Sequence, residues 1–441
     1  MISHFKSTHR RALASAVALI LFAACNFAAA ATICVAPGGK SGCKPTISSA
    51  VAIAAAGDII NVAAGTYADS VTITKPVSII GDPTSSPVID ATGQSTGIFV
   101  NGMSAAPLPG IANVLISGLT VKSADFEGIL VANGTNIMLV NNHVHNNNKA
   151  LKPGGGGCPG IPAFETNEGE DCGEGVHLMA VDHSSVIRNL VENNSGGILI
   201  SDETGPTSDN YIRENTVRYN GWDCGITLAS HGPATSVIPT AHLPFGIWRN
   251  VISHNDSHHN GLLAPGAGAG VGIFAPSPGT ANFANVVIGN QLYDNGLPGV
   301  TMHNHAFAPS PAPGVNLNDN VIVGNSIYGN AADTQDAFTS GPTGINVYSL
   351  APITGLVIEQ NIFTNESIDI AIKAPGGWAN IHFNDFNDAG VGIQNAGIFN
   401  VGSATINGTQ NWWNCVPGTT ANCAKDTGPK VTTAPRLKAP F

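Results

Sequence analysis

Charged residues are scarce in this chain: Asp, Glu, Lys and Arg together make up 11% of its 441 residues, and aromatic residues make up only 6%. This scarcity excludes coiled coils and helical bundles, which are rich in Glu, Lys and Arg. The few charges are also unbalanced, with 29 acidic residues against 18 basic ones and a formal net charge of −11. Such a chain is not expected to bind nucleic acid, because that binding depends on cationic contacts with phosphates.

Hydrophobic runs long enough to span a membrane are lacking beyond the amino terminus. At the start, basic residues precede an apolar run over 12–24 and a series of small residues up to Ala31. This order is typical of a secretory signal peptide, which we predict over residues 1–31. A lipoprotein anchor at Cys25 is a weaker alternative, because Phe22 fits poorly in such a site. We therefore expect a secreted or periplasmic protein with no membrane span.

Cysteine is sparse as well, with eight residues in total, and its spacing agrees with export. Three close pairs each enclose a loop rich in Gly, Pro or polar residues: Cys34 with Cys43, Cys158 with Cys172, and Cys415 with Cys423. We expect local disulfides at these pairs in an oxidising compartment. Cys224 is left over. A buried thiol is the favoured interpretation and a nucleophile the alternative, although no clear base lies beside it in sequence.

Glycine is abundant, with 52 residues, and a short sequence motif that contains two asparagines recurs along the chain. An apolar stretch is followed by Asn, four residues and a second Asn, at 189 and 194, 215 and 220, 255 and 260, 290 and 295, and 325 and 330. A further set of short strands starts with Gly, at Gly128, Gly175, Gly197, Gly225, Gly272, Gly299 and Gly344. Period-two alternation in runs this short indicates strands with one buried face.

These repeats predict a solenoid. No helical pattern separates the strands, which excludes βαβ units, and the repeat length varies too much for a propeller of four-stranded blades. Each coil is expected to stack on the next through parallel ladders that enclose Ile, Val and Leu. Asn suits a corner of such a coil, because it tolerates left-handed backbone angles and its amide can bond the same amide one coil away.

Both ends of the solenoid carry predicted caps. Residues 47–56 have the apolar spacing of a short amphipathic helix that closes the open end, and residues 59–62 are expected to begin the first coil. At the other end, Trp412 and Trp413 are expected to cover the last coil.

The entry segment and the repeats resemble a known superfamily. The resemblance rests on residues 46–51, 57–67 and 71–81, on the Asn-punctuated coils, and on the closing Asn411-Trp412-Trp413. These features are similar to the right-handed parallel β-helix proteins of the pectin-lyase-like superfamily, in particular its NosD-like branch. The resemblance implies one all-β domain over residues 32–420, with an amino-terminal capping helix, long loops on one edge and a tail over 421–441. It also implies work on polysaccharides, as a lyase, hydrolase, epimerase or binding protein.

Candidate site residues come from aligning the Gly strands with Gly as position zero. Position six then holds Glu203, His231, Pro278 and His305, position five adds Asp202, position four adds His303, and position two of a neighbouring coil holds His177. Because adjacent coils are about 4.8 Å apart, Glu203 and His231 should touch. Asp223 and the acidic loop 154–172 could face the same groove. Carboxylates and imidazoles together can supply a general acid and a general base.

Each of these residues also has a structural interpretation, as a turn cap or an ordinary surface histidine. Calcium on the acidic loops is a candidate ion, whereas zinc lacks a third ligand fixed by spacing. Polygalacturonase-like hydrolases carry a characteristic set of aspartates with a His and an Arg-x-Lys sequence, and no such set is found here. Arg436-Leu437-Lys438 has the Arg-x-Lys spacing but lies in the tail. We expect a protein that binds a polysaccharide and cleaves or modifies it. The alternatives are a non-catalytic envelope or adhesive solenoid and a periplasmic metal-handling protein.

Overall fold

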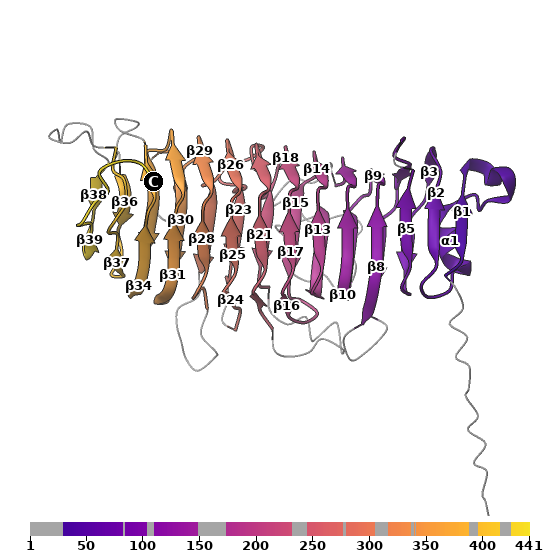
Figure 1. Cartoon of the computed structure of the whole chain (residues 1–441), viewed down its shortest axis with the longest axis horizontal. Helices are drawn as coiled ribbons and strands as arrows, with labels where there is room; N and C mark the ends of the chain where they lie inside the picture. The colour runs from indigo at the N-terminus through magenta and orange to yellow at the C-terminus, as the bar shows by residue number, and fades with distance from the viewer. Residues whose placement is uncertain are drawn as a thin grey trace, which may run out of the picture.

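The computed structural model describes residues 30–82, 84–103, 110–148, 173–231, 245–276, 279–304, 316–336, 339, 341–387, 396–414 and 425–441. In this part of the chain the strands stack in register along one axis, with the single α-helix at the amino-terminal end (Figure 1). All of the strand pairings within the two sheets are parallel, and each coil contributes up to three faces. This architecture is a parallel β-helix, as the sequence predicts.

The first face carries the candidate residues and is called the site sheet. Its strands are β4 (Val71–Ile73), β7 (Thr96–Asn101), the first half of β10 (Glu127–Val140), β12 (Glu174–Asp182), β15 (Gly196–Ser201), β19 (Ile226–Ala229), β23 (Val271–Phe274), β27 (Val300–Asn304), β30 (Thr343–Ser349), β33 (Ile368–Lys373), β36 (Ala396–Asn400) and β38 (Lys425–Thr427).

The second face is continuous with the first because β10 runs through both, and is called the flank sheet. It contains β1 (Thr32–Val35), β2 (Ile59–Val62), β5 (Ser78–Gly81), β8 (Ile111–Ser117), β13 (Ser185–Ile187), β17 (Tyr211–Arg213), β21 (Val251–Ser253), β25 (Val286–Ile288), β28 (Val321–Val323), β31 (Ile353–Glu359), β34 (Gly377–His382), β37 (Thr405–Asn407) and β39 (Val431–Thr432). The short strands β16 (Thr207–Ser208), β20 (Ile247–Trp248) and β24 (Asn282–Phe283) join it to the site sheet.

The third sheet contains β3 (Thr66–Ala68), β6 (Val88–Asp90), β9 (Thr120–Lys122), β11 (His143–His145), β14 (Leu190–Glu192), β18 (Thr216–Arg218), β22 (Asp256–His258), β26 (Gln291–Tyr293), β29 (Ser326–Tyr328), β32 (Ile362–Thr364) and β35 (Asp385–Phe386). A 3-10 segment, η1 (Pro37–Gly42), follows β1.

The core is a set of apolar columns that run along the axis. One column of the site sheet is formed by Ile98, Ile129, Val176, Ile198, Ile226, Val271, Val300, Ile345, Ile370 and Ile398, each at most 1% exposed. This register corrects one alignment made from the sequence. Val271 pairs with Ile226, so the equivalent glycine is Gly270 and not Gly272, and position six of that coil is Pro276 rather than Pro278.

Asparagine ladders form three corners of the coil. One joins Asn142, Asn189, Asn215, Asn255, Asn290, Asn325, Asn361, Asn384 and Asn411 through Nδ2-to-Oδ1 bonds of 2.9–3.0 Å. A second joins Asn147, Asn194, Asn220, Asn260, Asn295 and Asn330 and ends on Glu366. A third, shorter ladder joins Asn210, Asn250, Asn285 and Asn320. The predicted hydrogen bonding between asparagine amides of adjacent coils is confirmed, but the left-handed backbone angle expected at these asparagines is not. The left-handed residue is the one before the ladder asparagine, as at Arg188, Glu214 and His254.

The amino-terminal cap is shorter than the expected 47–56. Helix α1 (Ile47–Ile53) starts at a capping box, in which the Ser49 amide donates to the Thr46 hydroxyl at 3.1 Å, and it buries Ile47, Ala50 and Val51. Strand β1 precedes this helix and pairs with β2, so the ladder begins before residues 59–62.

At the other end, Trp413 is buried against Phe386 as a lid on the last core residues. Strands β38 and β39 then extend the ladder to Thr432, beyond the boundary expected at residue 420. The guanidinium of Arg436 lies 4.4 Å from the Trp413 ring, so the Arg436-Leu437-Lys438 sequence serves the end of the stack and not the site sheet.

Of the three expected disulfides, Cys34–Cys43 is present, with 4.8 Å between the Cα atoms. The pairs Cys158–Cys172 and Cys415–Cys423 lie outside the described residues, as do residues 1–29. Cys224 is buried and is not in a disulfide, as expected from its isolation in the sequence. Among the described helices, none combines the length and hydrophobicity needed to cross a membrane.

Candidate functional site

The candidate residues lie on the outer surface of the site sheet. His177 stands between the core residues Val176 and Leu178, so its side chain points outward, as predicted. Outward does not mean exposed here: His177 is 0% exposed, and so are Asp202 and Glu203. Buried polar groups of this kind need hydrogen-bond partners, and these partners define three neighbouring clusters.

The first cluster joins the coils of β15 and β19 beyond their carboxyl ends. Oε1 of Glu203 lies 2.9 Å from Nδ1 of His231, which confirms the contact expected from coil spacing. Asp202 accepts the His231 backbone N–H at 2.8 Å and the Ser230 hydroxyl at 2.6 Å. Asp202 therefore fixes the turn that carries His231, while Glu203 fixes the imidazole ring itself.

The second cluster is centred on His303 of β27. Its Nε2 lies 3.0 Å from Oδ2 of Asp333, and its Nδ1 lies 2.9 Å from Oδ2 of Asp336. Although burial by itself lowers the pKa of His303, the hydrogen bonds to both aspartates outweigh it and raise the pKa above its ordinary value. Burial likewise tends to raise the pKa of Asp333, but the bond from His303 holds it below its ordinary value. This arrangement favours an imidazolium held between two carboxylates.

A cavity of about 310 Å³ connects these two clusters. Its walls carry Asp223, His231, Phe274, His303, Asp333 and Asp336, together with Cys224 and the loop at 265–267. Asp223 accepts the Thr227 hydroxyl at 3.3 Å on its Oδ2. The edge of His303 meets Phe274, with 5.6 Å between the ring centroids. The cavity therefore combines two carboxylate-bonded imidazoles, an additional carboxylate and an apolar ring.

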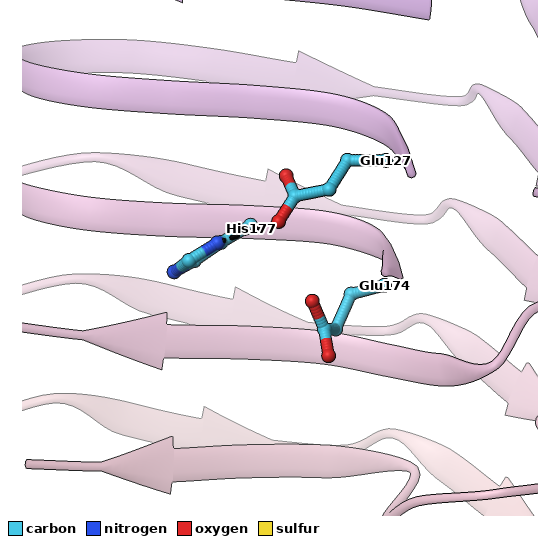
Figure 2. A group of neighbouring side chains, drawn as sticks. All are labelled: Glu127, Glu174 and His177. Atoms are coloured by element: carbon cyan, nitrogen blue, oxygen red, sulfur yellow. Dashed lines mark hydrogen bonds and ion pairs between the residues drawn. The ribbon is translucent and has the colours of Figure 1, made fainter. Parts of the chain in front are cut away.

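The third cluster lies at the amino-terminal part of β10 and β12 (Figure 2). Nδ1 of His177 lies 2.7 Å from Oε1 of Glu127, and Nε2 lies 2.7 Å from the Ser201 hydroxyl. Glu174 follows Glu127 one coil along, and the ligand atoms of Glu127, Glu174 and His177 lie within 4.8 Å of one another. Burial raises the pKa of Glu127, an effect that His177 partly offsets.

The structure gathers most of the predicted site residues. One cavity is lined by His231, His303 and Asp223. His231 is held in place by hydrogen bonds to Asp202 and Glu203. His177 belongs to the third cluster and does not line the cavity. His305 and the acidic loop 154–172, where calcium was expected, lie outside the described residues.

Sequence reasoning missed four acidic residues. Glu127 and Glu174 each precede the glycine of a site-sheet strand, so alignment of that preceding position would have shown them as neighbours. Asp333 and Asp336 come from the loop between β29 and β30, which has no repeat to align. Only the folded loop brings them to His303.

Comparison with known proteins adds a family match. A model described as a right handed beta helix region matches residues 84–239. No curated protein matches the chain in sequence.

Solved structures with similar coordinates include an alginate lyase from Paenibacillus sp. strain FPU-7, at 14% identity over 75% of this chain and 95% of that chain, with a TM-score of 0.43. A pectate lyase, Pel9A, matches at 17% identity over 82% of each chain, with a TM-score of 0.47. The A-module of the Azotobacter vinelandii mannuronan C-5 epimerase AlgE6 matches at 15% identity over 80% of this chain and 91% of that chain, with a TM-score of 0.45.

The parallel coils, the three-faced ladder and the family match lead to one assignment. This chain has the fold of a right-handed parallel β-helix.

Proposed function

We propose that this protein binds a polysaccharide along the site sheet and cleaves it at the cavity by acid–base catalysis. The observation that carries the proposal is that two imidazoles, each held by a buried carboxylate, open with Asp223 onto the same cavity. A proton donor and a proton acceptor on the two sides of a bond are what glycosidic cleavage requires.

The roles follow from the contacts. Glu203 holds Nδ1 of His231 and so orients the imidazole, which lines the cavity and can exchange a proton with the substrate there. Asp223 is one of three aspartates in the cavity wall, and it is suited to activate water or stabilise positive charge on the sugar. His303, with a raised pKa, presents positive charge near the leaving oxygen. Phe274 offers an apolar surface on which a sugar ring can pack.

The charges on the wall favour a neutral polysaccharide. None of the cavity-lining residues that the structure describes is Lys or Arg, whereas three of them are aspartates. A uronate carboxylate would be repelled there unless a cation intervened. Eliminative cleavage also needs that carboxylate neutralised before a proton can leave, so we favour hydrolysis over β-elimination.

A polysaccharide panel tests this proposal. The purified mature protein is incubated with neutral and uronate polymers, and new reducing ends and unsaturated products are measured separately. We expect reducing ends from a neutral polymer, and a loss of about 100-fold or more in His231→Ala or Asp223→Asn. His143→Ala is the matched control, because His143 also contacts a glutamate, Glu192, but on the third sheet.

Binding without turnover would support the alternative of a non-catalytic adhesive solenoid. Absence of both binding and products would overturn the proposal.

We further propose that the protein is exported. The basic and apolar start over residues 1–31 and the Cys34–Cys43 disulfide support this location. Amino-terminal sequencing of the chain recovered from the periplasm or medium of a bacterial host should begin near residue 32. A mature chain that still begins at Met1, recovered from the cytoplasm, would contradict it.

A further inference from the structure

None of the three residues of the third cluster, Glu127, Glu174 and His177 (Figure 2), lines the cavity, and none is assigned a step in the proposed cleavage. All three side chains are at most 1% exposed. They come from equivalent ends of two adjacent strands, because Glu127 and Glu174 both precede the glycine of a site-sheet strand and His177 lies three residues after Glu174. The parallel register therefore holds the three groups together without any contribution from a loop.

The buried carboxylates give the cluster an excess of negative charge. Oε2 of Glu127 is buried and meets no hydrogen-bond donor among the described residues. Its neighbour Glu174 is an acceptor when ionised, and it is only 1% exposed. Burying ionised carboxylates is costly unless a positive group is added. The imidazole of His177 can offset at most one of these charges.

The orientation of His177 fits a metal ligand. The Ser201 hydroxyl lies 2.7 Å from Nε2 and takes up that side of the ring, so Nδ1 faces the two glutamates. A hydrogen bond on the far nitrogen is the usual way in which proteins fix the tautomer and direction of a metal-bound histidine. In the His303 cluster, by contrast, each ring nitrogen faces its own aspartate, so that imidazole is held as a cation rather than as a ligand.

We propose that Glu127, Glu174 and His177 bind one divalent transition-metal ion, zinc or manganese, within the wall of the β-helix. Two carboxylates and a neutral imidazole form a mixed oxygen and nitrogen donor set that suits these ions, whereas calcium prefers oxygen ligands alone. The double positive charge of the ion balances both carboxylates, so the buried set becomes neutral.

The site lies directly behind the cavity. At Gly196, the point where a side chain would begin is 3.2 Å from Oε1 of Glu174 and 3.3 Å from Cβ of Asp223. Glu174 and Asp223 are thus separated by a single glycine position. The ion would act on the cavity through its charge, and its binding does not depend on the proposed cleavage.

Metal analysis of the untagged full-length protein tests the proposal. The protein is stripped with a chelator, reconstituted with Zn²⁺, Mn²⁺ or Ca²⁺, dialysed and measured by inductively coupled plasma mass spectrometry. We expect about one equivalent of Zn²⁺ or Mn²⁺ per chain, and a higher melting temperature with the ion than without it. Glu174→Gln should lose both the ion and the temperature shift, whereas Glu192→Gln, which alters the partly buried glutamate beside His143, should keep both.

Ser201→Ala covers the case in which Glu174→Gln fails to fold, because it keeps all three ligands. Loss of the hydrogen bond to Nε2 should weaken binding by about 10- to 100-fold, as is common when the partner of a metal-bound histidine is removed. Wild-type protein that retains neither ion after dialysis, or a Glu174→Gln variant that retains as much as wild type, would overturn the proposal. The cluster would then share a proton in place of an ion.

Discussion

Two His–Glu pairs on different faces of this β-helix have almost the same bond length and different surroundings. His231 and Glu203 meet at 2.9 Å above the site sheet, with side chains 8% and 0% exposed. His143 and Glu192 meet at 3.0 Å on the third sheet, with side chains 35% and 16% exposed. Glu192 also accepts a bond from Arg218 at 2.8 Å, and these contacts hold its pKa below its ordinary value although burial tends to raise it.

The difference shows what turns such a pair into a candidate site. Coil spacing alone produces both contacts. Glu203 and His231 are at equivalent positions of adjacent coils, and Glu192 lies two residues after Leu190, the partner of His143 in β14. On the site sheet, segments between the strands wall off a cavity around the pair, and a drier environment strengthens its electrostatic interactions. The third-sheet strands that carry the other pair, β11 and β14, follow the flank sheet through short corners, and the pair remains partly exposed.

The largest effect is expected from removing the carboxylate of each pair in turn. Glu203→Gln should lower kcat about 100-fold and leave KM nearly unchanged, because Glu203 orients His231 and does not contact substrate. It should also alter the pH profile of kcat. Glu192→Gln should change neither parameter. Equal changes in kcat for the two substitutions would show that burial does not distinguish the two pairs.

Most of the fold could be predicted from the sequence because the repeat itself encodes it. Asn255 and Asn290, for example, are 35 residues apart and hydrogen-bonded in the ladder, and each begins a copy of the repeated motif that can be recognised in the sequence. The failures have physical causes. Gly270 and Gly272 are two residues apart and therefore share a face of the strand, so alternation cannot tell one register from the other.

The candidate site could be predicted only where it follows the repeat. Glu203 and His231 are in the expected contact because they occupy equivalent positions in adjacent coils. Asp333 and Asp336 belong to a loop of irregular length, and nothing in the sequence ties that loop to His303. The sequence also gave no reason to expect that the outward His177 would be fully buried.

A large effect on stability is expected inside the ladder. Asn255→Ala removes the amide that donates to Ile212 O and Asn290 Oδ1 and that accepts from Asn215. The unpaired groups left behind should lower the free energy of unfolding by about 3 kcal/mol. Asn407→Ala is the control, because its only ladder-like bond, to Asn380, is exposed and 3.4 Å long among the described contacts. The midpoints of urea unfolding measure both; similar midpoints would show that the ladder contributes little.

A smaller, pH-dependent effect is expected at His303. Its raised pKa means that its stabilisation is complete below the unfolded value of 6.5 and is lost as the pH rises through the folded value. The lowered pKa of Asp333 means that its contribution to stability is present above the unfolded value of 3.8 and is lost as the pH falls through the folded value.

Asp336, Asn346 and Tyr348 also face the His303 ring, and only Asp336 among them carries charge in this range. His303→Asn should therefore cost about 2 kcal/mol between pH 4 and 6.5, and less above that range. His259→Asn removes a pair of 3.9 Å with Asp294, directly after β22, and should cost less than about 0.5 kcal/mol at any pH. Unfolding midpoints from pH 4 to 9 measure both, and a constant difference for His303→Asn would contradict the assignment.

The smallest effect is expected at a surface pair with good geometry and little burial. Arg249 donates from Nε and NH2 to the two oxygens of Asp209, at 2.8 and 2.6 Å, yet the arginine side chain is 58% exposed. Arg249→Ala should lower the free energy of unfolding by less than about 1 kcal/mol, and added salt should reduce the difference further. The bonds of Asp209 are as short as those of Asp202, so a large effect here would mean that geometry, and not burial, decides the strength of polar contacts in this β-helix. The distinction between the site sheet and the other faces would then have to rest on the cavity alone.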